Sequence, residues 1–566
     1  MLRRLILLAL TAAASARVSP AQTEPAQTEP APTHPQTALP VSQPIPGRLL
    51  ILYRDHTIPA NADSLARAAG ARAMRHLQHL GVTALAVAPA DEPRALAQLA
   101  ANPQVALVLH DRYVSAHSIH FSRVAIAVAL DAGDPTTSSS GTSSTITRRS
   151  VARAPLKPRT DPDPAPPSSS GGNESASTST SGSNPPQSTT DIDYDSPQGW
   201  AVRATGGYGD SIPGGAASGP WNISLGAGVR IAVLDSGVDA NHPDLSPNLA
   251  LNLSEINQTV LPSPCDDGSP QDQSGHGTWT ASLAAGALGS GTGNVIGVAP
   301  QATILNIKVL QRMPASGISD TTQACEAGQP GGLLSWVLQG IDDAVSQRAD
   351  IIALSLGTLV DTSTGEGAGL KSAFDQATYA ATQAGSVIIA ALGNDGLDLS
   401  TATLVELPAQ ARGVLAITAS TNPDCAENLT AGATCSAGPV TRPYYSNYDA
   451  TLNPIAAPGG SYPEASSTLT TGWIMGACSS GLTNTADGLP QNGQSLGCFN
   501  LDHTAYVQAM GTSASAALAA GAAAILRAAR PDLSAAQIVT ALRSSATQTS
   551  SMKEPLLNLA AALALP

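Results

Sequence analysis

The feature that most constrains the fold is an alternation of short apolar runs with longer helical stretches in the C-terminal part of the chain. The apolar runs predict strands at Val229–Leu234, Ile304–Leu310, Ile351–Leu356, Val387–Leu392 and Val414–Thr418. Between and after them, helices are predicted at His276–Leu288, Leu333–Ala349, Leu370–Ala384, Thr512–Ala529 and Ser534–Ser545. Such alternation indicates an α/β fold with a mostly parallel sheet and helices on both faces. We predict this domain over residues 191–566, with its function at the carboxyl ends of the strands.

A smaller folded unit is predicted ahead of this domain, over residues 47–117. Three strands alternate with two short helices in it, at 49–53, 64–69, 82–87, 92–101 and 105–109. A β-α-β-α-β unit of this length is large enough for a small α+β domain. Residues 118–190 are rich in Ser, Thr, Pro and Gly and cannot bury enough apolar surface to fold, so they are predicted to be a linker. Residues 22–46, rich in Pro and Thr, are predicted to be a second linker.

The first 21 residues have the features of a secretory signal peptide. Arg3 and Arg4 precede the apolar run Leu5–Leu10, and small residues follow as far as the Ala-Ser-Ala site at 14–16. The apolar run is too short to cross a bilayer. We therefore expect a secreted protein, either extracellular or periplasmic.

The six cysteines suit an oxidising compartment, because an even number in an exported chain suggests disulfides. Six cysteines allow 15 connectivities. We predict that nearest neighbours pair, as Cys265–Cys325, Cys425–Cys435 and Cys478–Cys498. Zinc is the rival interpretation, but the chain has no CxxC motif and no clustered His.

Charge and composition argue against two classes of partner. The formal net charge of −14 and the 3% aromatic content do not suit a nucleic-acid-binding surface. No apolar run beyond the signal peptide is long enough to predict a membrane span. We expect a monomer that does not bind nucleic acid and has no membrane span.

Asp235 and His276 stand in two motifs that suit either catalysis or a purely structural role. Asp235 ends the apolar run that begins at Ile231 and precedes Ser-Gly, so its carboxylate is predicted at the carboxyl edge of the sheet. An Asp that only caps a turn has the same pattern. His276 lies between Gly275 and Gly277 at the start of a predicted helix, where glycines indicate a close approach of the backbone.

Ser513 and Asn394 likewise suit either a structural or a catalytic role. Ser513 begins an Ala-rich helix, where a Ser is most often a cap. A nucleophile gains from the same place, because helix N–H groups stabilise developing negative charge. Asn394 follows a buried strand between glycines, either as a turn residue or as an amide directed into a site.

Five stretches together resemble the motifs of the subtilisin-like serine proteases: Asp235-Ser-Gly, Gly275-His276-Gly-Thr, Leu354-Ser355-Leu356-Gly357, Gly393-Asn394-Asp-Gly and Gly511-Thr-Ser513-Ala. The order Asp, His, Ser along the chain is the order of that family. The resemblance implies a secreted serine endopeptidase that hydrolyses polypeptides through an acyl-enzyme, is made as an autoprocessed zymogen, and requires no cofactor.

The resemblance also implies a role for each matching residue. Ser513 would be the nucleophile, His276 its general base, and Asp235 the residue that orients the imidazole. Asn394 would supply one donor of the oxyanion hole. The segment Ser355-Leu356-Gly357 would bind the extended backbone of the substrate.

The small unit resembles the inhibitory propeptide that accompanies many of these proteases. The implied partner is therefore the chain's own propeptide, which would occupy the cleft until it is cut. We predict the cut between Arg112 and Asp191, near the start of the linker.

Several positions depart from the family pattern. Ala514–Ala517 replaces the usual Met-Ala-Ala-Pro, which predicts a looser first helical turn. Trp279 replaces a second His, and is expected either to cover the site or to pack. Leu392 replaces Ala, which would narrow the pocket for the first substrate residue, and Ser236 replaces Thr.

Calcium is left unassigned. Asp244 matches a position that binds calcium in some relatives, but the loop Ala287–Val298 matches the partner loop poorly. A single carboxylate is too little for a calcium site with six to eight oxygens. No metal ligands are therefore predicted.

Two alternatives remain open. The altered segment Ala514–Ala517 is compatible with a protease-like protein that binds peptides and cleaves them weakly or not at all. The related sedolisins use a Glu base, and the motif Gly275-His276-Gly-Thr argues against them. A nucleotide enzyme is not expected, because the chain lacks a Walker-type phosphate loop.

Overall fold

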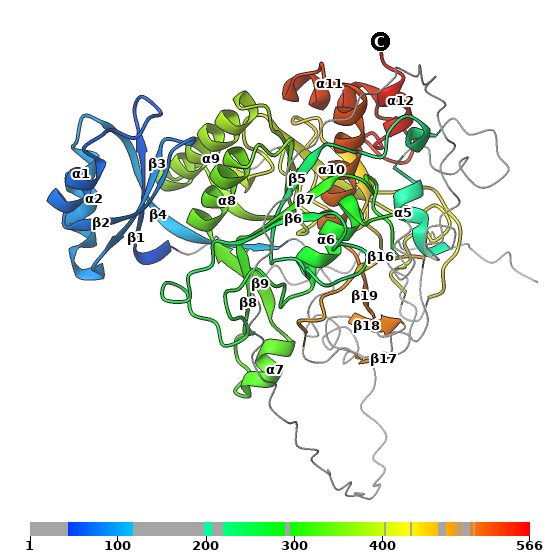
Figure 1. Ribbon diagram of the computed structural model, residues 1–566, viewed down its shortest axis with the longest axis horizontal. Coiled ribbons are helices and arrows are strands. Elements are labelled where there is room, and N and C mark those ends of the chain that lie inside the picture. Colours follow the sequence, from blue (N-terminus) through cyan, green and yellow to red (C-terminus); the bar gives the residue numbers. More distant parts are fainter. Residues whose placement is uncertain are drawn as a thin grey trace, which may run out of the picture. The chain divides into compact units, whose positions relative to one another are not determined.

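Among the described residues, seven parallel strands form the central sheet of the computed structural model, in the order β15-β14-β12-β10-β5-β7-β6 (Figure 1). Every neighbouring pair in this sheet is parallel. The strands are β5 Arg230–Asp235, β6 Leu249–Ser254, β7 Thr303–Lys308, β10 Ile351–Leu354, β12 Val387–Ala391, β14 Val414–Ser420 and β15 Ile455–Pro458. The predicted α/β fold with a mostly parallel sheet is therefore confirmed.

The structure describes residues 44–116, 197–205, 219–288, 295–400, 403–430, 433–461, 471–482, 486–487, 498–501 and 504–566. All of them belong to one compact unit, Val41–Pro566. The predicted signal peptide (1–21), nearly all of the first linker (22–46) and the long linker (118–190) lie outside the described residues.

Helices cover both faces of the central sheet (Figure 1). Helices α8 (Leu334–Ser346) and α9 (Gly365–Gln383) pack together on one face, and α6 (His276–Ala285) and α10 (Thr512–Ala529) pack together on the other. The shorter helices α11 (Ala535–Ser545) and α12 (Leu559–Leu563) follow α10.

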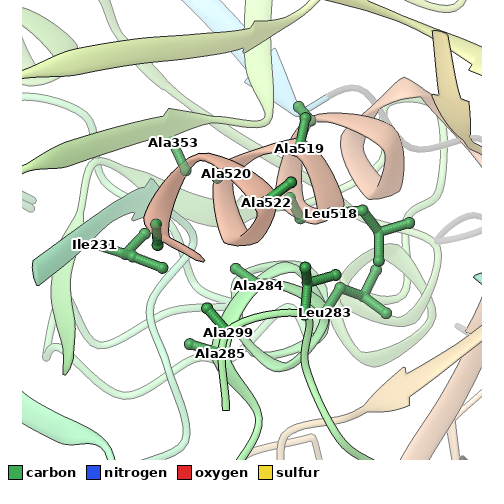
Figure 2. Close-up of a cluster of buried hydrophobic side chains, with 14 of the residues drawn as sticks. Ile231, Leu283, Ala284, Ala285, Ala299, Ala353, Leu518, Ala519, Ala520 and Ala522 are labelled. Carbon is green, nitrogen blue, oxygen red and sulfur yellow. The ribbon is translucent and has the colours of Figure 1, made fainter. Parts of the chain in front are cut away.

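Helix α10 lies in the core of the domain. Its length and apolar composition would suffice to cross a membrane, but 83% of it is buried inside the protein, as is expected of a core helix. Leu518 and Ala522 of α10 and Leu283 and Ala284 of α6 belong to one apolar cluster, in which small side chains allow the helices to lie close together (Figure 2). This packing positions the N-termini of α6 and α10 beside each other at the site.

The small unit is an antiparallel sheet in the order β4-β1-β3-β2, with two helices. Its elements are β1 Pro44–Tyr53, α1 Ala62–Ala68, β2 Ala71–Leu77, β3 Val82–Val87, α2 Glu92–Ala100 and β4 Val105–Ala116. Strand β2 was not predicted, because its Arg and His residues leave too few apolar side chains for a recognisable alternating pattern. Strand β4 is longer than predicted, since its last residues pair with the large domain.

The segment 351–356, predicted as one strand, is two strands in different sheets. Strand β10 ends at Leu354 in the central sheet, whereas β11 (Leu356–Asp361) pairs with β4 and with β13 (Leu404–Leu407). Ser355 is the residue between them. Likewise, the predicted strand 304–310 divides into β7 and β8 (Leu310–Met313), and β8 pairs with β9 (Gln329–Leu333).

A third sheet, of four strands among the described residues, was not predicted. It consists of β16 Ile474–Ala477, β17 Ala486–Asp487, β18 Cys498–Leu501 and β19 Thr504–Ala509. One disulfide, Cys478–Cys498, joins its strands. The other two are Cys265–Cys325 and Cys425–Cys435, so the predicted pairing is confirmed.

Candidate active site

Asp235, His276 and Ser513 form a continuous chain of hydrogen bonds. His276 Nδ1 lies 2.7 Å from Asp235 Oδ1, and His276 Nε2 lies 3.0 Å from Ser513 Oγ. All three residues are buried. Residues separated by 41 and 237 positions in the sequence are therefore brought together as predicted.

Each of the three side chains stands at the end of an element. Asp235 is the last residue of β5, His276 is the first residue of α6, and Ser513 lies in the first turn of α10. The carboxyl end of a parallel strand and the N-termini of two helices thus converge. This is the edge at which the N–H groups of the helices face the site and favour developing negative charge.

The glycines around His276 allow a close approach of two backbones. Gly275 has a φ of 89°, a left-handed conformation that suits glycine. A Cβ on Gly277 would lie 2.1 Å from the carbonyl oxygen of Gly237, in the turn after Asp235. A side chain at position 277 would therefore separate Asp235 from His276.

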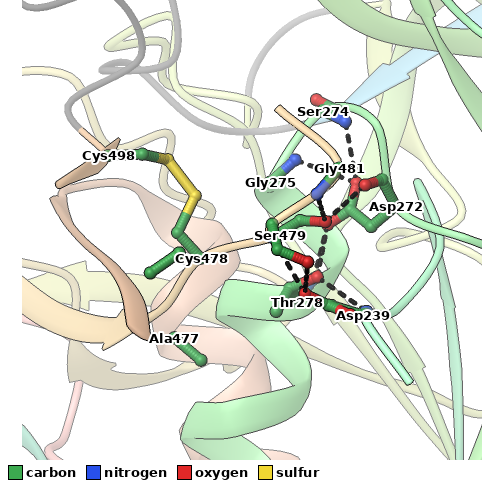
Figure 3. Close-up of a disulfide and its surroundings, with 12 residues drawn as sticks. Asp239, Asp272, Ser274, Gly275, Thr278, Ala477, Cys478, Ser479, Gly481 and Cys498 are labelled. Atoms are coloured by element: carbon green, nitrogen blue, oxygen red, sulfur yellow. Dashed lines mark hydrogen bonds between the residues drawn. A yellow bond between two sulfur atoms is a disulfide. The ribbon is translucent and has the colours of Figure 1, made fainter. Parts of the chain in front are cut away.

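Asp272, which the sequence analysis did not single out, anchors the loop that carries His276 (Figure 3). Its carboxylate accepts hydrogen bonds from the N–H groups of Ser274, Gly275 and Thr278, each at 2.9 Å. It also accepts one from Ser236 Oγ, at 3.0 Å, beside Asp235. Burial raises the pKa of Asp272, and the hydrogen bonds from Thr278 and its neighbours partly offset this.

Asn394 is oriented by the residue that precedes Ser513. Its Oδ1 accepts hydrogen bonds from Thr512 N at 3.0 Å and from Thr512 Oγ1 at 2.9 Å. Its amide Nδ2 is buried and has no hydrogen-bond partner among the described residues. A buried donor without a partner is rare in proteins, and here it is available to a ligand at the site.

The segment Ser355-Leu356-Gly357 adjoins Ser513. Ser355 Oγ donates a hydrogen bond to the carbonyl oxygen of Ser513 at 3.0 Å, and the carbonyl oxygen of Ser355 lies 3.1 Å from Ser513 Oγ. Ser355 is thus fixed to the start of α10 by two contacts.

The end of β4 pairs with this segment. Leu356 and Gly357 are the antiparallel partners of Ala116 and Ser115. On its other edge, β4 pairs with β9, where Ser115 is the partner of Gly331. Residues of the small unit therefore lie between two strands of the large domain, beside Ser513.

Side-chain contacts add to this strand pairing. Asp111, on β4, accepts hydrogen bonds from Ser335 N and Ser335 Oγ at the start of α8. Burial raises the pKa of Asp111, and the Ser335 hydrogen bonds partly offset this. Glu366, in the first turn of α9, contacts His110 and Arg112 of β4. Asp111 therefore places a carboxylate at the start of α8, which the helix dipole favours, whereas at the start of α9 the cations of β4 pair with the helix's own Glu366.

A second group of charges lies farther from Ser513. Arg75 of β2 contacts Glu255 at 2.8 Å and Asp343 of α8 at 2.6 Å. His79 contacts Asp342, also on α8, at 3.2 Å. The pKa of Glu255 is raised to about 8, because the group is buried and lies beside Asp343, while Arg75 acts in the opposite direction.

The positions that depart from the family pattern are accommodated by packing. Trp279 is buried, its Nε1 donates to the carbonyl oxygen of Ile474, and its ring meets that of His276 edge-on at 5.9 Å. Trp279 therefore packs beneath the site. Leu392 is also buried. Helix α10 is continuous through Ala514–Ala517, so the absence of a Pro does not interrupt it.

Asp244 is buried, and its Oδ2 accepts a hydrogen bond from Val295 N at 3.1 Å. Within the described part of the chain, no group of three or more His, Cys, Asp or Glu side chains is suited to hold a metal ion. Residues 289–294 of the predicted partner loop lie outside the described residues. Calcium binding therefore stays unassigned.

Comparison with known sequences agrees with this arrangement. The subtilase family profile matches residues 226–559. Thermitase from Thermoactinomyces vulgaris is 35% identical over 176 residues, which cover 31% of this chain and 51% of that protein. Subtilisin E from Bacillus subtilis is 36% identical over 192 residues, which cover 34% of this chain and 41% of that protein. The chain spans about half or less of the length of these curated relatives.

Two solved structures share the fold. The epidermin leader peptide processing serine protease of Staphylococcus aureus has a TM-score of 0.53 and 14% identity, and the match covers 91% of this chain and 97% of that one. Fervidolysin from Fervidobacterium pennivorans, a keratinolytic enzyme related to subtilisin, has a TM-score of 0.53 and 17% identity, with coverage of 93% and 62%. Since the family profile covers more than half of the residues and the fold agrees, this chain belongs to the subtilase family.

Proposed function

We propose that this chain is a secreted serine endopeptidase that hydrolyses polypeptides and is made as an inactive precursor. One observation carries the proposal: the His276 imidazole is hydrogen-bonded to the Asp235 carboxylate on one side and to the Ser513 hydroxyl on the other. A nucleophile, a base and a group that orients the base are the parts that acyl transfer needs.

In the proposed reaction, Asp235 Oδ1 accepts a hydrogen bond from Nδ1–H of His276, which leaves the Nε2 lone pair facing Ser513. Ser513 Oγ attacks the carbonyl carbon of the scissile bond while its proton passes to Nε2. The C–N bond then breaks, the leaving amine takes the proton from Nε2, and an ester remains on Ser513. Water hydrolyses this acyl-enzyme by the same steps.

Asn394 has the role of an oxyanion donor in this proposal. The negative charge that develops on the substrate carbonyl oxygen needs hydrogen-bond donors fixed in advance. The unpartnered Nδ2 of Asn394 and the backbone N–H of Ser513 at the start of α10 supply them. Thr512 holds the amide in this orientation through its two contacts to Oδ1.

The substrate backbone also activates Ser513. In the structure, His276 Nε2, at 3.0 Å, and the Ser355 carbonyl, at 3.1 Å, both lie within hydrogen-bond distance of the Ser513 hydroxyl. A substrate strand that pairs with Ser355-Leu356-Gly357 donates its own N–H to the Ser355 carbonyl. The hydroxyl proton is then left to His276, as general-base catalysis requires.

The small unit is proposed to be the inhibitory propeptide, with residues 113–116 filling the place of the substrate. Support comes from the pairing of β4 with both β9 and β11. In the antiparallel register Gly357–Ser115 and Leu356–Ala116, the next position of β11 is Ser355, which contacts Ser513. We therefore expect self-cleavage at the bond after His117.

Secretion is proposed from two features. The N-terminal sequence has the pattern of a signal peptide. All six cysteines form disulfides, which persist in oxidising compartments and are rare in the cytosol.

The test compares the full chain with its Ser513→Ala variant. We expect the unchanged chain to cleave casein, to cut itself after His117, and to be labelled by a fluorophosphonate at Ser513. The variant should fold, remain uncut and lack both activity and label. Equal casein cleavage by both proteins would overturn the proposal. A folded chain that binds peptides but is not labelled would instead identify a non-catalytic binding protein.

A further inference from the structure

A buried carboxylate that the proposed reaction does not use lies beside the oxyanion donor. Glu406, on β13, is 1% exposed. Its Oε2 lies 3.3 Å from the position that a Cβ on Gly393 would occupy. Gly393 directly precedes Asn394, so the carboxylate is separated from the oxyanion donor by one glycine.

Strand register shows which substrate side chain faces this carboxylate. Side chains alternate between the two faces of a strand, so Ser355, Gly357 and Leu359 share one face. Glu406 is the antiparallel partner of Leu359 and therefore stands on that same face. A substrate residue paired opposite Ser355 also directs its side chain to this face.

That substrate residue is the one whose carbonyl is attacked. Its carbonyl carbon must lie at Ser513 Oγ, which contacts the Ser355 carbonyl, and its carbonyl oxygen must lie at Asn394. Its side chain then extends between Gly357 and Gly393, neither of which has a side chain, and toward Asn447 and Glu406, whose side chains lie next to Gly393. Asn447 Nδ2 and Glu406 Oε2 are the two side-chain atoms nearest to the Cβ position of Gly393, so a substrate side chain that passes Gly393 meets the amide and the carboxylate.

We propose that Glu406 makes the enzyme select Lys or Arg at the residue that precedes the scissile bond of a separate substrate, whereas self-cleavage after His117 is intramolecular and proceeds without the preferred residue. This inference rests on the proposed function, since it names the substrate class of the same site. A carboxylate in a site shielded from water attracts a cationic side chain strongly, and an Arg fork can bind it through two parallel hydrogen bonds. The same charge repels Asp and Glu, so it selects for cations and against anions.

The test uses peptide anilides that are identical except for the residue before the anilide: Arg, Lys, Gln, Phe or Glu. Active enzyme is counted with a fluorophosphonate, and kcat/KM is measured for each peptide. For the unchanged enzyme we expect Arg and Lys to exceed Gln and Phe at least tenfold, with Glu the poorest substrate.

The isosteric variant Glu406→Gln removes the charge. It should lower kcat/KM for the Arg and Lys peptides at least tenfold, while the values for Gln and Phe change less than about threefold. Asp361→Asn is the matched control, because Asp361 is an acid on the same pair of strands, opposite Leu404 at the other end. This control should keep the preference for Arg and Lys.

The outcomes separate the two proposals. If no peptide is hydrolysed and no label is incorporated, the proposed function fails. If the enzyme is labelled and active but prefers Phe, or if Glu406→Gln leaves the ratio of Arg to Phe unchanged, the assignment of Glu406 is wrong. Should Glu406→Gln not fold, the ranking of the five peptides by the unchanged enzyme decides the question.

Discussion

At the scale of single residues, the Asn394 side chain acts in one step of the proposed reaction, the stabilisation of the oxyanion. Replacing it with Leu removes the donor Nδ2 while leaving Asp235, His276 and Ser513 in place. We expect kcat to fall by roughly 10²–10³, the loss that follows removal of such a donor in subtilisin, a member of the same family. KM should change little, because the donor acts on charge that appears only in the transition state.

Initial rates with one anilide substrate measure this effect. The melting temperature of Asn394→Leu, which should stay within a few degrees of the unchanged chain, serves as the control for folding. A variant with undiminished kcat would show that the oxyanion is stabilised elsewhere.

Asp272 is expected to act as a positioning residue. Asp272→Ala leaves the N–H groups of Ser274, Gly275 and Thr278 without their acceptor, and each buried donor left unpaired costs about 1–3 kcal/mol. The loop that carries His276 should loosen, so kcat should fall well below that of the unchanged chain even in the folded fraction.

The conservative variant Asp272→Asn distinguishes positioning from general destabilisation. It keeps one acceptor oxygen and should recover part of kcat at the same KM. Activity per fluorophosphonate-reactive site, measured at a temperature where both variants are folded, provides the comparison. If Asp272→Ala had the same kcat as the unchanged chain, Asp272 would not be a positioning residue for His276.

The sequence singled out the four residues of the proposed reaction but not the side chains that hold them in place. Asp235, His276, Ser513 and Asn394 stand at element ends next to glycines or a helix start, and such positions leave a pattern in the sequence. Asp272 lies in a polar loop without strand or helix periodicity, so nothing local distinguishes it from a surface Asp. Its importance depends on donors that the three-dimensional fold directs toward it.

At the scale of elements, the junction between α6 and the turn after β5 tolerates only glycine. Gly277→Ala places a methyl group 2.1 Å from the Gly237 carbonyl oxygen, so one backbone must move. We expect a loss of at least about 1–3 kcal/mol in the free energy of unfolding and a marked fall in kcat, because the movement separates Asp235 from His276.

Gly365→Ala is the matched control for this variant. A Cβ at position 365, in the first turn of α9, meets nothing within 4 Å. Ala at this position should leave stability unchanged or raise it slightly. Denaturant unfolding of the two variants measures the difference, and equal stabilities would refute the steric argument.

The elements were predicted best where a single periodic pattern spans them. Helix α10 and strand β3 have the predicted bounds, because an unbroken apolar or Ala-rich run defines each. The change of sheet at Ser355 was not predicted, since the residues on both sides are equally apolar and the apolar run continues across the junction. Tertiary pairing, not local preference, separates β10 from β11.

At the scale of the whole molecule, the contact between the small unit and the large domain should weaken as pH rises. Burial and Asp343 raise the pKa of Glu255 to about 8 in the assembled protein. We expect release of the small unit to expose Glu255; because burial is the largest cause of the raised pKa, its loss should outweigh the loss of Arg75 and lower the pKa toward the ordinary value near 4.3, although Asp343 remains beside it. The assembled form therefore holds an extra proton between these two pKa values, so affinity is highest at acidic pH and decreases until the pH passes about 8.

We expect affinity to fall at least about tenfold between pH 6 and pH 9. Size-exclusion chromatography of the self-cleaved protein at these pH values measures dissociation. The isosteric variant Glu255→Gln should flatten the dependence, and a dissociation constant that does not change with pH would contradict it.

The pairing of the small unit with the large domain was not predictable from either segment alone. Strand β4 was expected to end at 109, where the apolar alternation stops, yet it continues to Ala116. Its last residues, Arg112 to Ala116, are mixed in polarity because they lie between β9 and β11 instead of against one apolar core. Their conformation is determined by partners more than two hundred positions later in the chain.

Because β4 pairs with both β9 and β11, the proposed self-cleavage depends on the assembly of the large domain. The strand can lie between β9 and β11 only after both have formed, and Ser513 can reach the following bond only after α10 has packed against α6. Under the proposed function, cleavage of the precursor would therefore depend on correct assembly: a misassembled copy would keep its N-terminal segment attached, and only a correctly assembled copy would become an active protease.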